Sequence, residues 1–415
     1  MLSSRLPKDL SPSPFFAELE RAKAEVFAEC AGADGREGNA AGLSFIDMTV
    51  SSPVKAGLPI DLNAAVDEGR ESFGCWNPDA AGWKSAREAV VEYYRERGGN
   101  FDAGQIILTA STSEAYSVLF KAFCDPGDVI LTPMPGYPLL DTLAQLEHLE
   151  CAPYFLKLSR EKRGSGFRFV LDTDSLLSAP EKAKILLLVS PHNPTGHCVS
   201  RTEWNEVVSF CEQHNLILVV DEVFGDYGFS DDVRRTWEFM DPIAALQGDN
   251  GPKCPIFWLN GLSKAVGSPQ LKLGWMAFYA PEEQFEPIRA ALEFVEDAYL
   301  SVSAPAQALG SSLLKQSAAY ESQVRERLLA NWNTLRQAFP SKYCPEVIGG
   351  WYAAIRLGAD DEELTLRLLK EKHVLVQPGF FFDFDEDGWV VVSLLQEPAL
   401  FKEAVERILY ITRGN

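Results

Sequence analysis

Residues 259–264 read Leu-Asn-Gly-Leu-Ser-Lys and place a single lysine, Lys264, in a small hydroxyl-bearing turn directly after an apolar run. A second cation, Lys272, follows and leads into another apolar run. A lysine amine can form an imine with an aldehyde once desolvation and neighbouring cations lower its pKa. The same stretch also fits an ordinary surface loop with two lysines, because short motifs match by chance. The rest of the chain has to decide between these interpretations.

The length and composition predict an ordinary globular protein with two domains, or with one large domain and a smaller satellite. The chain has 415 residues, of which 46% are hydrophobic and 23% are charged, and its formal net charge is -21. This length exceeds the size at which a single core stops growing. Strong negative charge argues against nucleic acid or an anionic membrane as the main partner, because phosphates would be repelled. An anionic small ligand remains possible where local cations and backbone N–H groups hold it.

Cysteine and histidine usage indicates a cytoplasmic protein with an organic cofactor. The eight cysteines are scattered, without a C-x-x-C pair, and the chain has only five histidines, so we expect no metal site. The N-terminus lacks the apolar segment of a signal peptide, and no run is long enough to span a membrane. We therefore expect a cytoplasmic location and no membrane partner.

From residue 105 onward the pattern alternates between apolar strands and helices, which is typical of α/β folds. The runs at 185–189 and 216–220 are almost continuously apolar, as parallel strands covered on both faces require. Two more strands of this region are expected at 106–108 and 128–132. Before this region we expect helices at 15–31 and 83–97, a Gly- and Asp-rich loop at 32–41, and a short strand at 46–50.

Polar residues follow several of these strands at their carboxyl ends, where open α/β sheets bind ligands. Residues 111–114, Ser-Thr-Ser-Glu, open a helix with a strong cap, and the same geometry can hold a phosphate on backbone N–H groups. Tyr137 lies in a stiff proline-rich loop, and residues 190–196 read Ser-Pro-His-Asn-Pro-Thr-Gly. Asp221 ends an apolar strand, where a carboxylate is costly unless it meets a cation such as a protonated ring nitrogen. A helix cap or a structural salt bridge would explain Asp221 equally well.

Five features follow one another along the chain: the helix start, the loop aromatic, the Asn-Pro-Thr-Gly turn, the strand-end Asp and the Ser-Lys turn. In this order the sequence resembles the fold type I enzymes that use pyridoxal 5'-phosphate, specifically class I/II aminotransferases. The resemblance covers the chain from about residue 40 to the end. It implies an α/β fold: a large domain with a mostly parallel seven-stranded sheet covered by helices, plus a smaller α+β domain from both chain ends. The implied division is an N-terminal arm and part of the small domain at 1–60, the large cofactor-binding domain at 61–300 and the small domain at 301–415. The resemblance further implies helices at 282–300 and 311–339, and strands of the small domain at 349–357, 374–377 and 390–395.

The resemblance also implies a homodimer and a role for each motif residue. Lys264 is similar to the lysine that forms an imine with the cofactor and later moves a proton on the substrate. Asp221 resembles the partner of the pyridinium nitrogen, which makes the ring an electron sink. Asn193 resembles the residue that bonds the ring hydroxyl, and Tyr137 the ring that stacks on the cofactor. The remaining implied cofactor contacts, mostly to the phosphate, are Ser111, Thr112, Ser113, Ser263 and Lys272.

Several positions depart from the common pattern of this family. Lys272 stands where an arginine is usual, Phe224 replaces a tyrosine, and Gly261 replaces a serine near the phosphate. Val391 occupies the place of an arginine that clamps the substrate's α-carboxylate with two hydrogen bonds. Either another cation takes this task or the substrate is held by its other end. The candidates for substrate contacts are Ser51, Trp76 and Arg356.

Two of these candidates also have simpler explanations. Trp76 falls where the neighbouring subunit commonly offers a tyrosine, and with Trp351 and Tyr352 it would suit an aromatic pocket. Aromatic residues are as readily plain core, however. Arg356 lies on an expected strand, where an arginine is often only a surface residue.

The sequence therefore predicts a pyridoxal-phosphate-dependent aminotransferase that moves an amino group between an amino acid and a 2-oxo acid. Because the carboxylate arginine is missing, β- or γ-elimination or replacement stays open, as in carbon–sulfur lyases and aminocyclopropane-carboxylate synthases, with S-adenosylmethionine as one candidate substrate. A third possibility is a non-catalytic protein that binds the cofactor, although Lys264, Asp221 and Asn193 are all present. The substrate itself is not named by the sequence.

Overall fold

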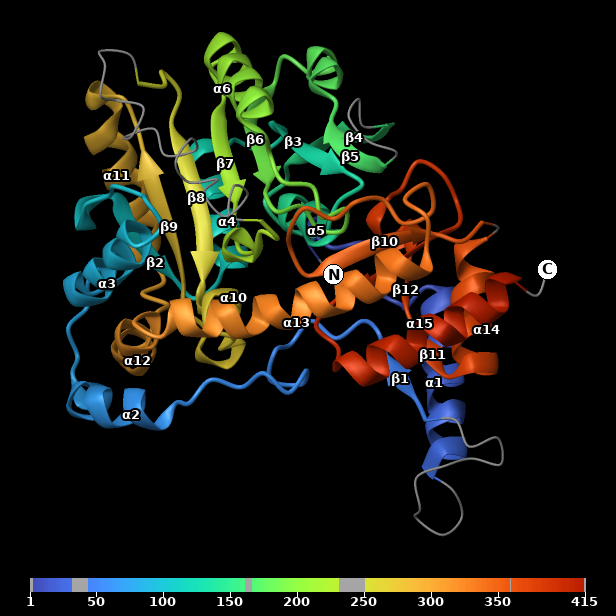
Figure 1. The fold of residues 1–415 in the computed structure, drawn as a ribbon. Coiled ribbons are helices and arrows are strands. Elements are labelled where there is room, and N and C mark those ends of the chain that lie inside the picture. Colours follow the sequence, from blue (N-terminus) through green and yellow to red (C-terminus); the bar gives the residue numbers. More distant parts are fainter. Residues whose placement is uncertain (1–2, 32–43, 161–165, 231–250, 359, 414–415) are drawn as a thin grey trace.

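The computed structural model describes residues 3–31, 44–160, 166–230, 251–358 and 360–413 (Figure 1). The loop expected at 32–41 lies outside these residues. Figure 1 shows a large sheet with helices on both sides, and beside it a smaller unit in which the two ends of the chain meet. The α/β fold class predicted from the sequence is confirmed, while the proposed division at residues 60 and 300 stays a prediction.

The large sheet has eight strands in the order β2-β9-β8-β7-β6-β3-β4-β5. Strands β4, β3, β6, β7 and β8 run parallel, whereas β9 is antiparallel to both of its neighbours. The strand bounds are β2 Ile106–Thr109, β3 Val129–Met134, β4 Glu150–Arg160, β5 Phe167–Leu171, β6 Ala183–Val189, β7 Ile217–Asp221, β8 Ile256–Gly261 and β9 Gly274–Tyr279.

The large sheet has one strand more than the seven predicted, because β4 pairs with two other strands. Residues 150–155 of β4 pair with β3, while residues 156–160 pair with β5 in an antiparallel hairpin. The hairpin therefore extends the sheet beyond the part that carries the polar strand ends.

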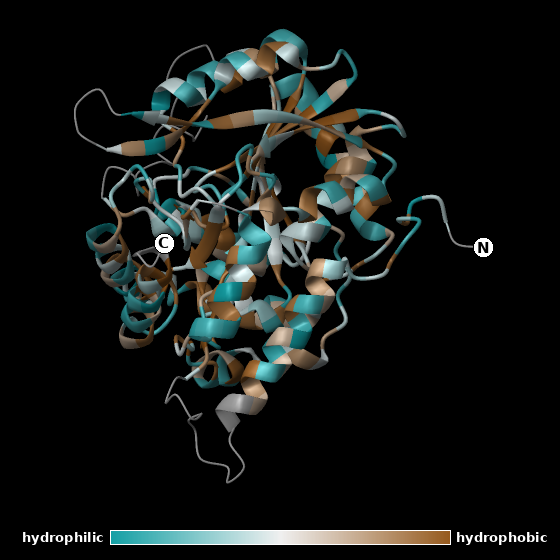
Figure 2. Cartoon of the chain, turned by 90° about the vertical axis from the view of Figure 1, so that its right-hand side faces the viewer, coloured by the Kyte–Doolittle hydropathy of each residue, from teal (hydrophilic) through white to brown (hydrophobic). Residues whose placement is uncertain are grey.

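Alternating side chains of the central strands pack into two separate cores, one on each face of the sheet. Leu186 and Leu188 belong to one cluster, whereas Ile185 and Leu187 belong to the other. Figure 2 shows this hydrophobic interior against hydrophilic outward helix turns. The covering helices are α3 Lys84–Arg95, α4 Thr112–Phe123, α5 Leu139–Leu146, α6 Arg201–His214 and α11 Glu282–Asp297.

The smaller unit combines both ends of the chain, as predicted. Strand β1 (Ile46–Asp47) pairs in parallel with β11 (Val374–Leu375), and a second sheet has the order β10-β13-β12. Helix α1 packs on α14 through Phe15, Leu19 and Leu369. The bounds are α1 Pro14–Ala31, β10 Tyr352–Arg356, α14 Asp361–Lys372, β12 Gln377–Pro378, β13 Trp389–Ser393 and α15 Pro398–Arg413.

The single helix expected at 311–339 is two helices, α12 (Ala304–Leu314) and α13 (Ser317–Ala338). Helix α12 begins earlier than expected because the Ser303 hydroxyl accepts a hydrogen bond from the Ala306 N–H, and a proline lies in the first turn. The chain also forms two short helices, α2 (Asn63–Gly69) and α10 (Leu262–Ala265).

The described ranges show neither a membrane span nor a cluster of metal ligands. Within them, no helix has the length and apolar character needed to cross a bilayer. The same residues contain no group of three or more His, Cys, Asp or Glu side chains that could hold a metal ion. The cytoplasmic location stays a prediction.

Candidate active site

A cavity of about 220 Å³ lies at the carboxyl ends of the parallel strands β6, β7 and β8. Its floor includes Val189, Asp221 and Gly261, the last residues of these three strands. This is the edge at which open α/β sheets bind ligands. Of the predicted site residues, the cavity is lined by Ser51, Ser111, Thr112, Ser113, Tyr137, Asn193, Asp221, Ser263 and Lys264.

Three predicted site residues do not line this cavity. Lys272 is exposed, and its backbone adopts the left-handed conformation with φ 53°. Trp76 is 82% exposed and lines a different cavity. Arg356 forms an ion pair with Glu386 at 2.5 Å and borders a third cavity. The structure therefore separates these side chains from the other nine.

The start of helix α4 forms one wall of the cavity. The Ser111 hydroxyl caps the helix by accepting a hydrogen bond from the Glu114 N–H at 3.1 Å. Thr112 and Ser113 follow in the first turn and also line the cavity. The free N–H groups and the positive end of the helix dipole make this wall suited to an anion.

Two glycines allow the strands to approach this helix start closely. A Cβ atom on Gly274 would lie 3.0–3.1 Å from backbone atoms of Ser111 and Thr112. A Cβ atom on Gly261 would lie 2.9 Å from the Gly274 Cα atom. Any side chain at Gly261 would therefore push β8 and β9 apart, which gives a physical reason for glycine in place of the serine usual in the resembled family.

Lys264 lies on the short helix α10, directly after β8. Its Nζ atom is 3.3 Å from the backbone oxygen of Ser51, and 4.6 Å and 5.5 Å from the ring centres of Trp351 and Phe224. Burial lowers the pKa of Lys264 to about 8, and the nearby charge of Asp221 acts in the opposite direction. A substantial fraction of the amine is therefore neutral, and hence nucleophilic, at mildly alkaline pH.

Asp221 is held by two donors at the end of β7. The Tyr116 hydroxyl donates to Oδ2 at 2.7 Å, and the Val223 N–H donates to Oδ1 at 3.1 Å. Burial raises the pKa of Asp221, while these hydrogen bonds and the charge of Lys264 lower it. The sequence interpretation missed Tyr116, although its position one helical turn after Thr112 places it on the same face of α4.

Asn193 offers an unsatisfied polar group to the cavity. Its Oδ1 atom is buried and has no hydrogen-bond partner among the described residues. The turn around it is fixed by a backbone hydrogen bond from the His192 N–H to the His197 oxygen at 2.7 Å, and by a 2.9 Å contact between His192 Nδ1 and Thr195 Oγ1. A buried amide oxygen without a partner is costly, so a ligand donor would fit there.

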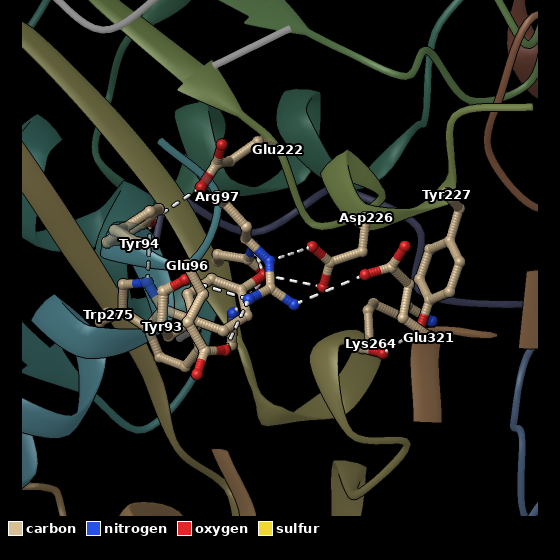
Figure 3. A network of polar contacts seen from close by, with 12 residues as sticks. Tyr93, Tyr94, Glu96, Arg97, Glu222, Asp226, Tyr227, Lys264, Trp275 and Glu321 are labelled. Atoms are coloured by element: carbon tan, nitrogen blue, oxygen red, sulfur yellow. Dashed lines mark hydrogen bonds and ion pairs between the residues drawn. The ribbon is translucent and has the colours of Figure 1, made fainter. Parts of the chain in front are cut away.

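A buried ionic cluster lies behind Lys264 (Figure 3). Arg97 donates from Nε to Asp226 Oδ1 and lies 3.8 Å from Glu321. The Tyr93 hydroxyl donates to the other Asp226 oxygen at 2.8 Å. Although burial lowers it, the pKa of Arg97 is held above its ordinary value by the charge of Asp226.

Tyrosines next to this cluster form hydrogen bonds with residues that follow β7 and β8. The Tyr227 hydroxyl donates to the backbone oxygen of Lys264 at 2.6 Å. Tyr94 donates to Glu222 Oε1 at 2.7 Å and accepts from Trp275 Nε1 at 2.9 Å. Burial raises the pKa of Glu222 well above its ordinary value and so disfavours its charged form. Asp221 is the carboxyl group whose charge acts on the pKa of Lys264.

Comparisons with known proteins agree with this geometry. Residues 66–408 match the family model described as aminotransferase class I and II. The chain is 25% identical over 346 residues to glutamate-pyruvate aminotransferase AlaA of Haemophilus influenzae, covering 80% of this chain and 81% of that protein. It is 26% identical over 385 residues to the tyrosine aminotransferase of Bos taurus, covering 88% and 81%.

Solved structures show the same fold. The alanine aminotransferase from Pyrococcus furiosus matches with a TM-score of 0.79 and 21% identity, over 98% of this chain and 100% of that one. A double mutant of the aspartate aminotransferase of Thermus thermophilus matches with a TM-score of 0.79 and 21% identity, over 99% of each chain. At this level of identity the likeness speaks for the fold alone.

The cluster behind Lys264 generates a prediction about stability. Asp226→Ala should lower the free energy of unfolding by about 3–5 kcal/mol, because it leaves the buried Arg97 charge without its main partner. Urea unfolding followed by circular dichroism measures the change. The double variant Arg97→Met/Asp226→Leu should recover part of the loss, because the Arg97 charge that Asp226→Ala strands is removed together with its partner.

The matched control is Asp67→Ala, which removes a surface partner of Arg70. It should change the unfolding free energy by less than about 1 kcal/mol. Equal losses in Asp226→Ala and Asp67→Ala would contradict the structural role assigned to the cluster.

Proposed function

The chain belongs to the aminotransferase class I and II family, and we propose that it binds pyridoxal 5'-phosphate and moves an amino group between an amino acid and a 2-oxo acid. The observation that carries the proposal is the meeting of Lys264, Asp221, Asn193 and the start of α4 in one cavity. These groups come from four separate parts of the chain, and each offers a different kind of contact.

The described residues fit the parts of this cofactor. Its phosphate would lie on the N–H groups and hydroxyls at the start of α4, where the helix dipole favours an anion. Its ring nitrogen would pair with Asp221, and its ring hydroxyl would bond the side-chain amide of Asn193, whose oxygen lacks a partner among the described residues. Tyr137 lines the same cavity and can stack on the ring.

Lys264 would carry both the covalent attachment and the proton transfer. When bound, pyridoxal phosphate supplies an aldehyde that captures amines and a ring that accepts negative charge from the substrate's Cα. The Lys264 amine, whose pKa burial lowers to about 8, would attack the aldehyde and later take and return the Cα proton. Asp221 would keep a positive charge on the far side of the ring.

Elimination or replacement is the second candidate reaction, and one observation favours it. Among the described residues that line the cavity there is no arginine, so a substrate α-carboxylate has no bidentate partner there. Val391, at the position where the resembled family carries that arginine, is fully buried in β13. A loosely held carboxylate leaves the reaction outcome open.

A half-reaction separates the two reactions. We expect an amino donor to convert the bound cofactor from its aldehyde form to its amine form, seen as a loss of visible absorbance, and a 2-oxo acid alone to reverse the change. Release of ammonia with pyruvate or 2-oxobutyrate, while the aldehyde absorbance returns unaided, would instead establish elimination.

Lys264→Ala tests the catalytic assignment in the same assay. The variant should slow the half-reaction by at least about 100-fold, because it removes the general base. Lys264→Arg is the control that keeps a positive charge but not a neutral amine at working pH. Turnover by Lys264→Ala at the wild-type rate would contradict the catalytic role assigned to this lysine.

The reactivity of Lys264 should depend on pH. Attachment of pyridoxal phosphate to the apoenzyme, trapped by borohydride and counted by mass spectrometry, should quicken as pH rises through about 8 and then level off, because only the neutral amine attacks. Asp221→Asn should move this inflection to lower pH, since the Asp221 charge raises the pKa of Lys264.

Glu222→Gln is the matched control for that shift. Burial raises the pKa of Glu222 well above its ordinary value and disfavours its charge, so replacement by a neutral amide should leave the inflection in place. An inflection that moves equally in Asp221→Asn and Glu222→Gln, or in neither, would refute the electrostatic coupling.

We also propose that the protein works as a homodimer, as the family resemblance implies. Large apolar side chains outside the cavity support this, since Trp76, Phe294 and Tyr299 are 82%, 81% and 57% exposed. Exposed aromatic residues of this size favour contact with a partner. Light scattering should give twice the chain mass, and a monomeric mass at micromolar concentration would contradict the proposal.

A further inference from the structure

The cavity contains almost no charge beyond what the proposed cofactor would use. Among the described residues that line it, only Lys264 and Asp221 are charged. Both are assigned to the cofactor in the function proposed above. No ionic group among these lining residues is left over for the side chain of a substrate.

The remaining walls are apolar or neutral. They consist of Leu139 and Leu140 at the start of α5, Val223 and Phe224 after β7, Leu273 before β9, and Tyr352 on β10. The Tyr352 ring is buried, and only its hydroxyl offers a hydrogen-bonding group. Such a wall favours apolar groups and penalises a charge that loses its water.

On the face of the β10–β13 pair that carries Tyr352, the nearest neighbouring residues carry no positive charge either. Tyr352 lies opposite Ser393, and Ala354 lies opposite Val391, in the antiparallel pair of β10 and β13. Directly opposite residues and every second residue along a strand share one face. Val391 is therefore on the same face as Tyr352, and it presents a methyl-bearing side chain there.

A second cavity of about 110 Å³ adjoins the first and is acidic. The two cavities share Tyr137 and Leu140 as lining residues. The second one also includes Asp141 and Asp383. A long acidic side chain that reached past Leu140 would meet these two carboxylates and be repelled.

From these walls we infer that the amino donor carries an uncharged, apolar side chain, and that dicarboxylic amino acids are poor donors. The inference rests on the proposed aminotransferase function and names its substrate class. A carboxylate in the first cavity would lose its hydration without gaining a cation, and one in the second would face like charges. An apolar side chain loses nothing comparable and buries its surface against Leu139, Leu140 and Phe224.

Side chains of similar shape but different charge test the inference. The holoenzyme is mixed with L-leucine, L-asparagine and L-aspartate, and with L-methionine, L-glutamine and L-glutamate, and the single-turnover loss of cofactor absorbance is followed. We expect leucine to exceed aspartate, and methionine to exceed glutamate, by at least about tenfold in the second-order rate constant, with the amides between. The comparison of glutamine with glutamate isolates the charge.

A cation introduced at the wall should relax this preference. Leu139 is the first residue of α5 and is only partly buried, so a longer side chain fits without opening a core. Leu139→Arg should raise the ratio of glutamate to glutamine rates by at least about tenfold, because the guanidinium supplies the missing partner. Leu139→Gln, similar in reach but uncharged, should keep the ratio of the parent protein.

The outcomes are distinguishable. Aspartate or glutamate reacting as fast as the matched apolar donors, or L-lysine outrunning methionine, would overturn the substrate class while leaving the aminotransferase function intact. The substrate class is overturned in the same way if Leu139→Arg, folded and loaded with cofactor, does not change the ratio. If no donor in either series changes the absorbance of the loaded protein, the aminotransferase function itself fails, and the substrate class fails with it.

Discussion

The site depends on one electrostatic arrangement, a lysine amine and an aspartate carboxylate that line the same cavity at the edge of the large sheet. Burial works against both charges, because it lowers the pKa of Lys264 and raises the pKa of Asp221, while each charge partly restores the other. The opposed effects bring the pKa of the lysine to about 8. An amine near that value can be neutral for attack and still take up a proton, which a solvated lysine at neutral pH cannot do well.

The fold holds this arrangement by ending two adjacent parallel strands at the same edge. Asp221 is the last residue of β7, and β8 pairs with β7 and leads directly into the turn of Lys264. Behind them, Tyr227 bonds the Lys264 backbone, and Tyr94 bonds Glu222. Burial raises the pKa of Glu222 and disfavours its charge. This matters because a second ionised carboxylate beside Asp221 would raise the pKa of the lysine and oppose the effect of burial.

The sequence predicted the parts of the site that depend on local signals. The apolar run before Asp221, the cap at Ser111 and the turn around Asn193 each indicate a strand end or a helix start. What remained hidden depends on distant contacts. Tyr116 reaches Asp221 only because α4 packs against the sheet, and the strand β5 forms only because β4 is long enough to serve two partners. Lys272 has the right charge, yet its left-handed backbone lies outside the cavity lining.

The departures from the resembled family form a consistent set once the contacts are known. Gly261 allows β8 to lie close to Gly274 of β9, and Gly274 in turn lies against the start of α4. Phe224 and Trp351 place ring faces near the Lys264 ammonium, which stabilises the cation without adding a formal charge. Val391 and the Leu139–Leu140 wall remove charge from the substrate side as well. A site built in this way selects among substrates because it offers no partner to a charged side chain. Its specificity therefore arises from the penalty on a buried, unpaired carboxylate rather than from a strong attraction to one preferred side chain.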